Sequence, residues 1–174
     1  METDNIQLLS TLIYLILIFI SVIISVMGSI LIIRALTHRQ INVKEEIVRN
    51  RNIGMALVLG SFIWTLGRMC LESTKPIMNV WYDSYASGFA VKSILSFLLG
   101  MIVSLLSAIL IGAITVYLAI KILLVITKDI NEWWEMKRGN MAVGIVISIT
   151  VLVVGTFFES IVSYIVMHIF DIGL

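Results

Sequence analysis

The chain has little charge, one cysteine and one proline among its 174 residues. Charged residues make up 13% of it, about half of the roughly 25% usual in water-soluble domains, while 60% is hydrophobic. This shortage excludes an ordinary soluble domain, and the net charge of +1 argues against a nucleic-acid-binding surface. The single Cys70 excludes an internal disulfide and a cysteine-rich metal site. The single Pro76 is typical of long helices joined by few loops.

Four long apolar segments predict an all-α membrane protein with four transmembrane helices. They span residues 8–33, 52–73, 93–120 and 141–170, and a bilayer core about 30 Å thick needs roughly 20 apolar residues in a helix. The segments are too long and lack the alternation of barrel strands. The flank "METDNIQ" has no Lys or Arg and no small-residue cleavage site follows, so we expect the first span to remain as an anchor.

Lysine and arginine gather in the first and third connections. They are Arg34, Arg39, Lys44, Arg49 and Arg51 in the first, and Lys121, Lys128, Lys137 and Arg138 in the third. The middle connection holds Lys75 and Lys92, and the ends hold none. Basic loops stay in the cytoplasm, so we expect both termini outside. Four aromatic residues in the middle connection suit the outer membrane–water boundary. They are Trp81, Tyr82, Tyr85 and Phe89.

The second half of the sequence repeats polar and small residues of the first half. The matches are Arg34 with Lys121, Asn42 with Asp129, Glu45 with Glu132, Asn52 with Asn140, Val58 with Val146, Gly67 with Gly155, and Glu72-Ser73 with Glu159-Ser160. Shared hydrophobicity does not explain such matches. They predict two parallel helix-hairpin repeats, residues 1–75 and 93–174, joined by an outer connection over 76–92.

Each cytoplasmic connection carries a pattern typical of a short helix. Asn42 with Glu45, and Asp129 with Glu132, match a capping box. In the second connection, Ile130, Trp133 and Trp134 would share one face with Lys137 and Arg138 behind it, which predicts a short interfacial helix at the lipid headgroups. A solvated turn is the alternative.

Two segments resemble the repeated hairpin of the YjfL-like bacterial inner-membrane family of unknown function. They are "EEIVRNRNIGMALVLGSFIWTLG" and "NEWWEMKRGNMAVGIVISITVLVVG", in which an acidic residue, a basic or polar cluster, Asn and spaced glycines lead into a span. The resemblance covers roughly residues 10 to 165 and implies a bacterial inner-membrane location and paired hairpins, but no activity. Gly54, Ile145 and Arg68 depart from the family pattern.

Small residues form a stripe at helical spacing in every span. The stripes are Ser21, Ser25, Gly28 and Ser29; Ala56, Gly60 and Gly67; Ser93, Ser96, Gly100, Ser104 and Ser107; and Gly144, Ser148, Gly155, Thr156, Glu159 and Ser163. Small side chains let helix backbones approach closely in lipid, which predicts helix–helix contacts within the chain or between subunits. A polar conduit lined by the hydroxyls is the alternative.

Three ionisable residues in the spans form a candidate intramembrane cluster. Arg68 and Glu72 share one face of the second span, and Glu159 is the repeat-matched carboxylate on the fourth. Arg68 lies roughly 24 Å along its helix, in the outer part of the hydrocarbon. The cluster predicts either a staple between the second and fourth helices or an ion or proton site, with snorkelling of single side chains as a third interpretation.

No other group of residues predicts chemistry. Asn52 and Asn140 open their spans, where an amide can bond exposed backbone or a neighbouring repeat. His38 and His168 lie at opposite ends of the protein and cannot share a metal. Ser163 and His168 lack a third catalytic group, and no cofactor motif is present.

The sequence therefore predicts a non-enzymatic inner-membrane protein with a structural or accessory role. We expect a homo-oligomer whose basic cytoplasmic loops, with Trp133 and Trp134 as anchors, contact anionic lipid or a peripheral protein. An ion or proton channel or small transporter that uses Arg68, Glu72 and Glu159 is the alternative. We expect no cofactor, no metal and no nucleic acid.

Overall fold

The computed structural model of the chain describes residues 2–37, 40–86, 91–128 and 131–171. These residues form four long α-helices, α1 (Glu2–Leu36), α2 (Ile53–Ala86), α3 (Val91–Ile126) and α5 (Met141–Asp171). Two short elements lie between them, the π-type turn η1 (Glu45–Arg49) and the helix α4 (Glu132–Lys137). The described part of the chain contains no strand, so the predicted all-α class is confirmed.

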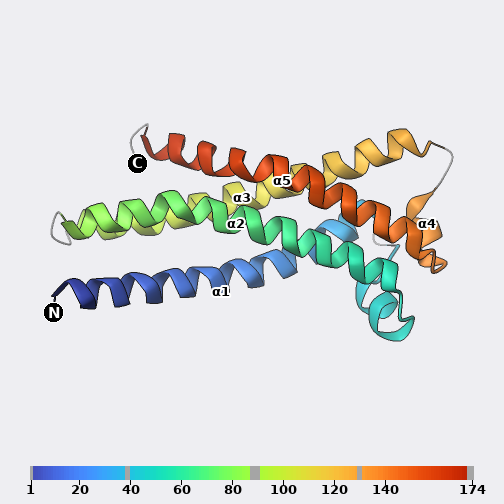
Figure 1. The fold of residues 1–174 in the computed structure, drawn as a ribbon, viewed down its shortest axis with the longest axis horizontal. Coiled ribbons are helices and arrows are strands. Elements are labelled where there is room, and N and C mark those ends of the chain that lie inside the picture. The colour runs from blue at the N-terminus through green and yellow to red at the C-terminus, as the bar shows by residue number, and fades with distance from the viewer. Residues whose placement is uncertain (1, 38–39, 87–90, 129–130, 172–174) are drawn as a thin grey trace.

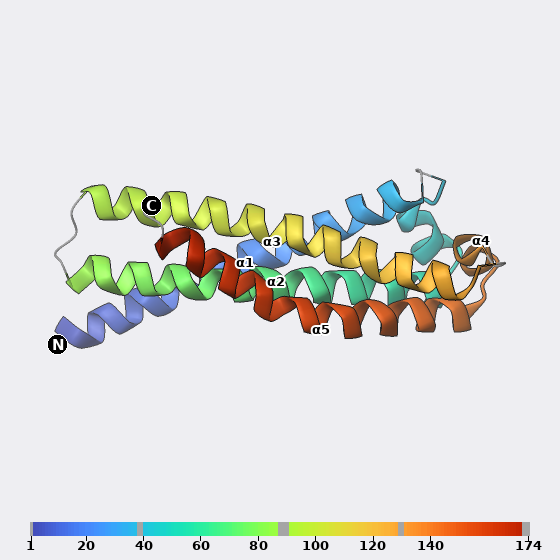
Figure 2. The ribbon, with the colours of Figure 1, turned by 90° about the horizontal axis from the view of Figure 1, so that it is seen from above.

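The four long helices lie side by side along the length of the molecule (Figures 1 and 2). α1 and α3 run in one direction and α2 and α5 in the other (Figure 1). The start of α1 and the end of α5 lie at one end of the molecule, and η1 and α4 lie together at the opposite end (Figure 1). The first and third connections, both rich in basic residues, therefore share one end of the bundle.

Every long helix contains a segment long and apolar enough to cross a membrane. These segments are Leu8–Leu36, Ile53–Asn79, Leu95–Ile126 and Met141–His168. Large apolar side chains such as Leu110 and Phe157 point away from the protein, as expected where the surrounding solvent is hydrocarbon. The predicted membrane protein with four candidate spans is thus confirmed.

α2 is the central helix of the bundle. Its most extensive contact is with α5, followed by contacts with α3 and α1, whereas α1 contacts α3 only slightly. The side chains of Val58, Phe62 and Met69 on α2 are completely buried, each within an apolar cluster that α2 shares with its neighbours. α2 therefore holds the other three helices in place.

The outer connection is shorter than the sequence predicts. α2 continues through Pro76 to Ala86, and α3 already begins at Val91, so most of the expected connection over 76–92 is helix. A proline disturbs the local helix ladder. Nearby, the Ser104 hydroxyl of α3 donates a hydrogen bond of 2.6 Å to the Ser73 carbonyl and supports the α2 backbone.

Trp81, expected at the outer membrane–water boundary, points into the bundle and not toward its surroundings. Trp81 is buried, its ring centroid lies 5.1 Å from that of Phe97, and its Nε1 donates to the Ser10 hydroxyl at 3.3 Å. The reason is the extension of α2, which carries Trp81 between α1 and α3. Tyr82 is exposed as expected. The side chain of Tyr85 and all of Phe89 lie outside the described residues.

Candidate functional site

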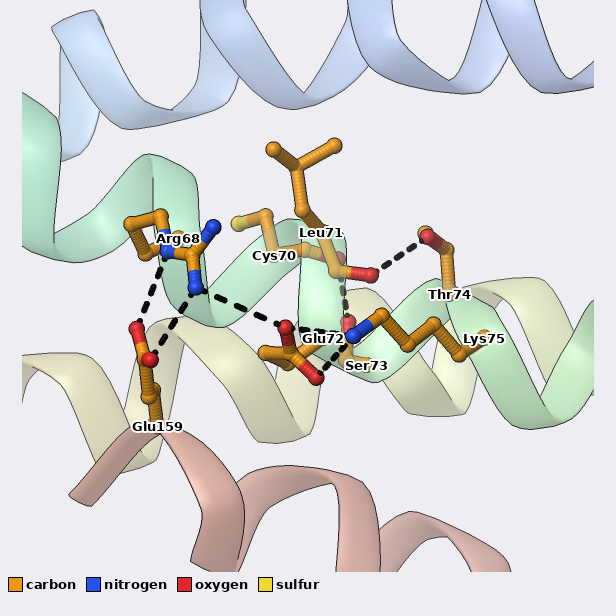
Figure 3. A network of polar contacts seen from close by, with 8 residues as sticks. All are labelled: Arg68, Cys70, Leu71, Glu72, Ser73, Thr74, Lys75 and Glu159. Atoms are coloured by element: carbon orange, nitrogen blue, oxygen red, sulfur yellow. Dashed lines mark hydrogen bonds and ion pairs between the residues drawn. The ribbon is translucent and has the colours of Figure 1, made fainter. Parts of the chain in front are cut away.

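Arg68 and Glu159 join α2 to α5 through two parallel hydrogen bonds. Arg68 Nε donates to Glu159 Oε2 and Arg68 Nη2 donates to Glu159 Oε1, both at 3.0 Å (Figure 3). A planar guanidinium that meets both oxygens of a carboxylate forms a strong and directional ion pair. This pair fixes the rotation of one helix relative to the other.

The cluster continues along α2 to a fourth charge. Glu72 Oε1 lies 3.8 Å from Arg68 Nη2, and Lys75 Nζ donates to both oxygens of Glu72 at 2.6 and 2.7 Å (Figure 3). The structure thus brings Arg68, Glu72 and Glu159 together as the sequence predicts, and adds Lys75. Its i,i+3 spacing from Glu72 is the signal that identifies this partner from sequence.

The cluster is electrically balanced, because two carboxylates alternate with two cations in the order Glu159, Arg68, Glu72, Lys75. A cavity of about 10 Å³ adjoins it, with Thr65, Arg68, Gly155 and Glu159 in its lining. The Thr65 hydroxyl in that lining has no hydrogen-bond partner among the described residues. This volume suits a single water molecule. The geometry therefore favours a staple between α2 and α5 over an ion-binding site.

Glycine residues allow α2 and α5 to touch closely near the same interface. A Cβ atom on Gly144 would lie 2.4 Å from the Gly54 Cα, and one on Gly155 would lie 2.7 Å from the Thr65 Cγ2. Gly54 did not belong to the predicted stripe of its span. Two members of that stripe, Ala56 and Gly60, are exposed, and a Cβ on Gly60 would meet nothing within 4 Å. Helical periodicity in the sequence identifies small residues that share one face of a helix. It does not show which neighbouring helix, if any, that face contacts.

The stripe hydroxyls of α1 are turned to their own helix. Ser21 donates to the Leu17 carbonyl, Ser25 to that of Val22 and Ser29 to that of Ser25, at distances of 2.6 to 2.8 Å. Ser148 of α5 likewise donates to the Gly144 carbonyl at 2.7 Å. Hydroxyls engaged in this way are suited to close packing, which favours the helix-contact interpretation over a polar conduit.

Asn52 connects the two hairpins at the end of the bundle that holds η1 and α4. Its Oδ1 accepts a hydrogen bond of 3.0 Å from the Met55 amide, so it caps α2, and its Nδ2 donates to the Met136 carbonyl at 2.7 Å and to Glu46 Oε2 at 3.3 Å. Asn140 is exposed and its Nδ2 donates only locally, to Glu135 Oε2 at 3.3 Å. One of the two matched asparagines is therefore a bridge between connections and the other is not.

Each of these two connections contains a short helical element, η1 or α4, with a cap that differs from the prediction. Asn42 Oδ1 accepts from the Glu45 amide at a long 3.5 Å, and Glu45 pairs with Arg49 at 3.6 Å. α4 is capped by Asn131, whose Oδ1 accepts from the Trp134 amide at 3.1 Å. Asp129 and Ile130 lie outside the described residues. Asn131 directly precedes Glu132, the first residue of α4, and is therefore its N-cap. The three-residue spacing from Asp129 to Glu132 had indicated Asp129 as the cap.

The two tryptophans of α4 have different surroundings. Trp134 is 54% exposed, with the Arg138 guanidinium 5.6 Å from the centroid of its ring. Trp133 is half-buried and packs against the apolar cluster at this end of the bundle. Of the two tryptophans, Trp134 is thus the one whose ring is available for contacts with the surroundings of the protein.

Basic residues of both connections line one cavity at the same end. The cavity has a volume of about 320 Å³ and lies between the start of α2 and the start of α5. Arg51 enters it from the first connection, and Lys137 and Arg138 enter it from the second. The sequence does not reveal this convergence, because the two sets of residues are more than 80 positions apart. We call Arg51, Lys137 and Arg138 the basic cavity residues.

His168 contacts an aromatic ring on its own helix. His168 is exposed and stacks on Tyr164, with the ring centroids 6.1 Å apart, whereas His38 lies outside the described residues. Among the described residues, no group of three or more His, Cys, Asp or Glu side chains is placed to hold a metal ion.

Comparison of this chain with models of protein families, with curated proteins and with solved structures finds no match. The resemblance to the YjfL-like family therefore stays a prediction from the quoted segments, and the candidate sites are described from their own geometry.

Proposed function

We propose that this chain is a non-enzymatic protein of the bacterial inner membrane with a structural or accessory role, whose cytoplasmic end binds anionic lipid headgroups. Its termini would then lie outside the cytoplasm. The observation that carries the proposal is the convergence of Arg51, Lys137 and Arg138 on one cavity of about 320 Å³. Three cations around one hollow suit a phosphate group, and basic residues at the cytoplasmic surface attract anionic lipid.

The neighbouring side chains support a position at the membrane surface. The exposed Trp134 ring presents an apolar face beside Arg138, and tryptophan prefers the headgroup region because its ring is apolar with one polar edge. α4 lies at the end of the molecule where the second and fourth candidate spans begin (Figure 1). α4 would then lie at the membrane–water boundary.

The binding test compares two triple variants with equal loss of charge. We expect R51Q/K137Q/R138Q to lose most of the thermal stabilisation that phosphatidylglycerol gives the purified protein over phosphatidylcholine. The control K44Q/R49Q/K128Q removes three exposed cations at the same end that do not line the cavity. If the two variants lost equal amounts of this thermal stabilisation, the lipid would be responding to the overall charge of the protein. That result would contradict the cavity as the binding site.

The alternative function is an ion or proton channel or small transporter. It is less favoured because Glu72 and Glu159 are each paired with a cation. Reconstitution in liposomes discriminates between the two functions. An ion flux that disappears in E72Q/E159Q, with assembly intact, would support the channel, and the absence of flux in the unaltered protein supports the structural role.

Self-association and a peripheral protein partner are further parts of the proposal. Exposed apolar side chains on every long helix leave room for contact with a second copy as well as with lipid. The mass of the protein in lipid nanodiscs measures this directly, and a monomer would contradict it.

A further inference from the structure

The basic cavity, which Arg51, Lys137 and Arg138 line between the starts of α2 and α5, has an excess of positive charge. None of its lining residues in the described part of the chain is an aspartate or a glutamate. Arg138 has one acidic neighbour, Glu135, at 3.7 Å, whereas Arg51 and Lys137 form no ion pair with the described residues. Most of the positive charge is therefore left for a ligand.

The two helices that begin at this cavity add to its positive potential. Ile53 and Gly54 at the start of α2 and Met141 at the start of α5 belong to its lining. The two starts touch, because a Cβ on Gly144 would lie 2.4 Å from the Gly54 Cα. The beginning of a helix carries a partial positive charge. An anion in the cavity therefore meets two helix starts in addition to three cations.

The side chain that caps α2 does not engage the first two amides of the helix. Asn52 Oδ1 accepts from the Met55 amide at 3.0 Å, and the Asn52 carbonyl accepts from the Ala56 amide at 3.1 Å. The amides of Ile53 and Gly54 take part in neither bond, and both residues line the cavity. Because the first amides of a helix have no acceptor within it, they are suited to phosphate oxygens.

Arg51 has a backbone conformation that favours glycine. Its φ is 51°, in the left-handed region that is costly for a residue with a Cβ atom. It follows Asn50, the C-cap of η1, and glycine is the usual residue at this place. Gly139, which also lines the cavity, has a comparable φ of 89°. An arginine here gives up backbone stability and adds a cation to the cavity, which indicates a role for its side chain.

We propose that the basic cavity binds a phosphate monoester in preference to a phosphate diester. A monoester carries about two negative charges at pH 7 and has three free oxygens, whereas a diester carries one charge. Arg51, Lys137 and Arg138 pair with these oxygens, and the first amides of α2 donate to them. The inference rests on the proposed function, because it names the lipid at the same cavity as phosphatidic acid. A soluble phosphate ester presents the same group.

The test compares two lipids that differ by one methyl group and one charge. Native mass spectrometry measures the binding of phosphatidic acid and of phosphatidylmethanol, its methyl diester, to the purified protein. We expect phosphatidic acid to bind about tenfold more tightly, as one additional charge beside partly exposed cations implies. Equal binding of the two lipids would overturn the proposal.

Arg51→Gly separates a role in binding from a role in folding. Glycine suits a φ of 51°, so the thermal unfolding midpoint without lipid should stay the same or rise. The preference for phosphatidic acid should fall from about tenfold to about threefold. The control Arg49→Gln removes an exposed arginine of η1 that does not line the cavity, and it should keep the preference. A preference that Arg51→Gly keeps in full would contradict the proposal. If Arg51→Gly does not fold, Lys137→Gln decides in the same way.

Glycerol 3-phosphate carries the same monoester without acyl chains, so it separates the two sources of the group. Weak binding of it, with the lipid preference present, assigns the cavity to phosphatidic acid, and binding as tight as that of the lipid assigns it to a soluble ester. The proposed function fails independently. Equal binding of both lipids that is lost in R51Q/K137Q/R138Q would overturn the preference alone, whereas no binding of either lipid would also overturn the anionic lipid site.

Discussion

The interface between α2 and α5 is packed much more closely than the interface between α1 and α2. The matched residues Gly155 and Gly67 show the difference directly. A Cβ on Gly155 of α5 would lie 2.7 Å from Thr65 of α2, whereas a Cβ on Gly67 of α2 would lie at an ordinary 3.7 Å from the Ser25 hydroxyl of α1. The same residue type at matched positions therefore serves one tight contact and one loose contact.

The matched acidic residues differ in the same way. Glu159 forms a bidentate pair across the α2–α5 interface, while Glu72 pairs mainly with Lys75 on its own helix. A repeated sequence pattern thus supplies similar residues to both hairpins, and their surroundings decide which of them join helices. The α2–α5 pair is expected to be the most stable part of the bundle.

The largest expected effect comes from Gly144→Ala. The added methyl group would lie 2.4 Å from the Gly54 Cα, and backbone cannot move aside without separating α2 from α5. We expect a loss of about 3 kcal/mol in the free energy of unfolding in mixed micelles. Gly60→Ala is the control, because its methyl group meets nothing within 4 Å. Equal stability of the two variants would show that the helices do not touch at Gly144.

A smaller loss is expected when the ion pair between the helices is broken. Glu159→Gln removes the negative charge and one of the two acceptor oxygens that face Arg68, so that Glu72 at the longer distance is the remaining carboxylate beside it. We expect a loss of about 2 kcal/mol in the free energy of unfolding, between the values for exposed and buried pairs. Glu72→Gln should cost less than half of this, since Arg68 keeps Glu159. The free energies of unfolding of the two variants, measured in the same micelles, show which loss is larger. A larger loss in Glu72→Gln would show that the pair across the α2–α5 interface is not the more important one.

An effect smaller than that of Glu159→Gln separates the matched glycines. Gly155→Ala should destabilise the protein by about 1 kcal/mol, because overpacking against Thr65 exceeds the gain in helix propensity. Gly67→Ala should be neutral or slightly stabilising. The double variant Gly155→Ala with Thr65→Ala should regain the stability lost in Gly155→Ala. If it does not, the contact with Thr65 is not the cause of the destabilisation.

The spans were predictable from sequence because their composition alone determines the outcome in lipid. The full length of α2 was not predictable, because Pro76 and the polar residues around it indicate a connection. In the structure α2 extends to Ala86, and Trp81 in this extension packs on Phe97 of α3. The contact between Gly54 and Gly144 was also hidden, since periodicity does not identify the facing helix.

The charged cluster was predictable because intramembrane charges need partners, and Arg68 with two carboxylates offered few combinations. The basic cavity at the end of the bundle that holds η1 and α4 was not predictable. It depends on folding of the two connections against each other, which the Asn52 bond to the Met136 carbonyl secures. The burial of Glu46 and Glu132, each 4% exposed, follows from that folding and contradicts the usual exposure of glutamate in loops.

The proposed function requires that the two short connections lie together at the cytoplasmic surface. Single cysteines at Asn42 and Asn131, in a Cys70→Ala background, test this with a membrane-impermeant maleimide applied to intact cells. The account predicts that neither position is labelled until the membrane is opened, and that both are labelled afterwards. Labelling of either position in intact cells would contradict it.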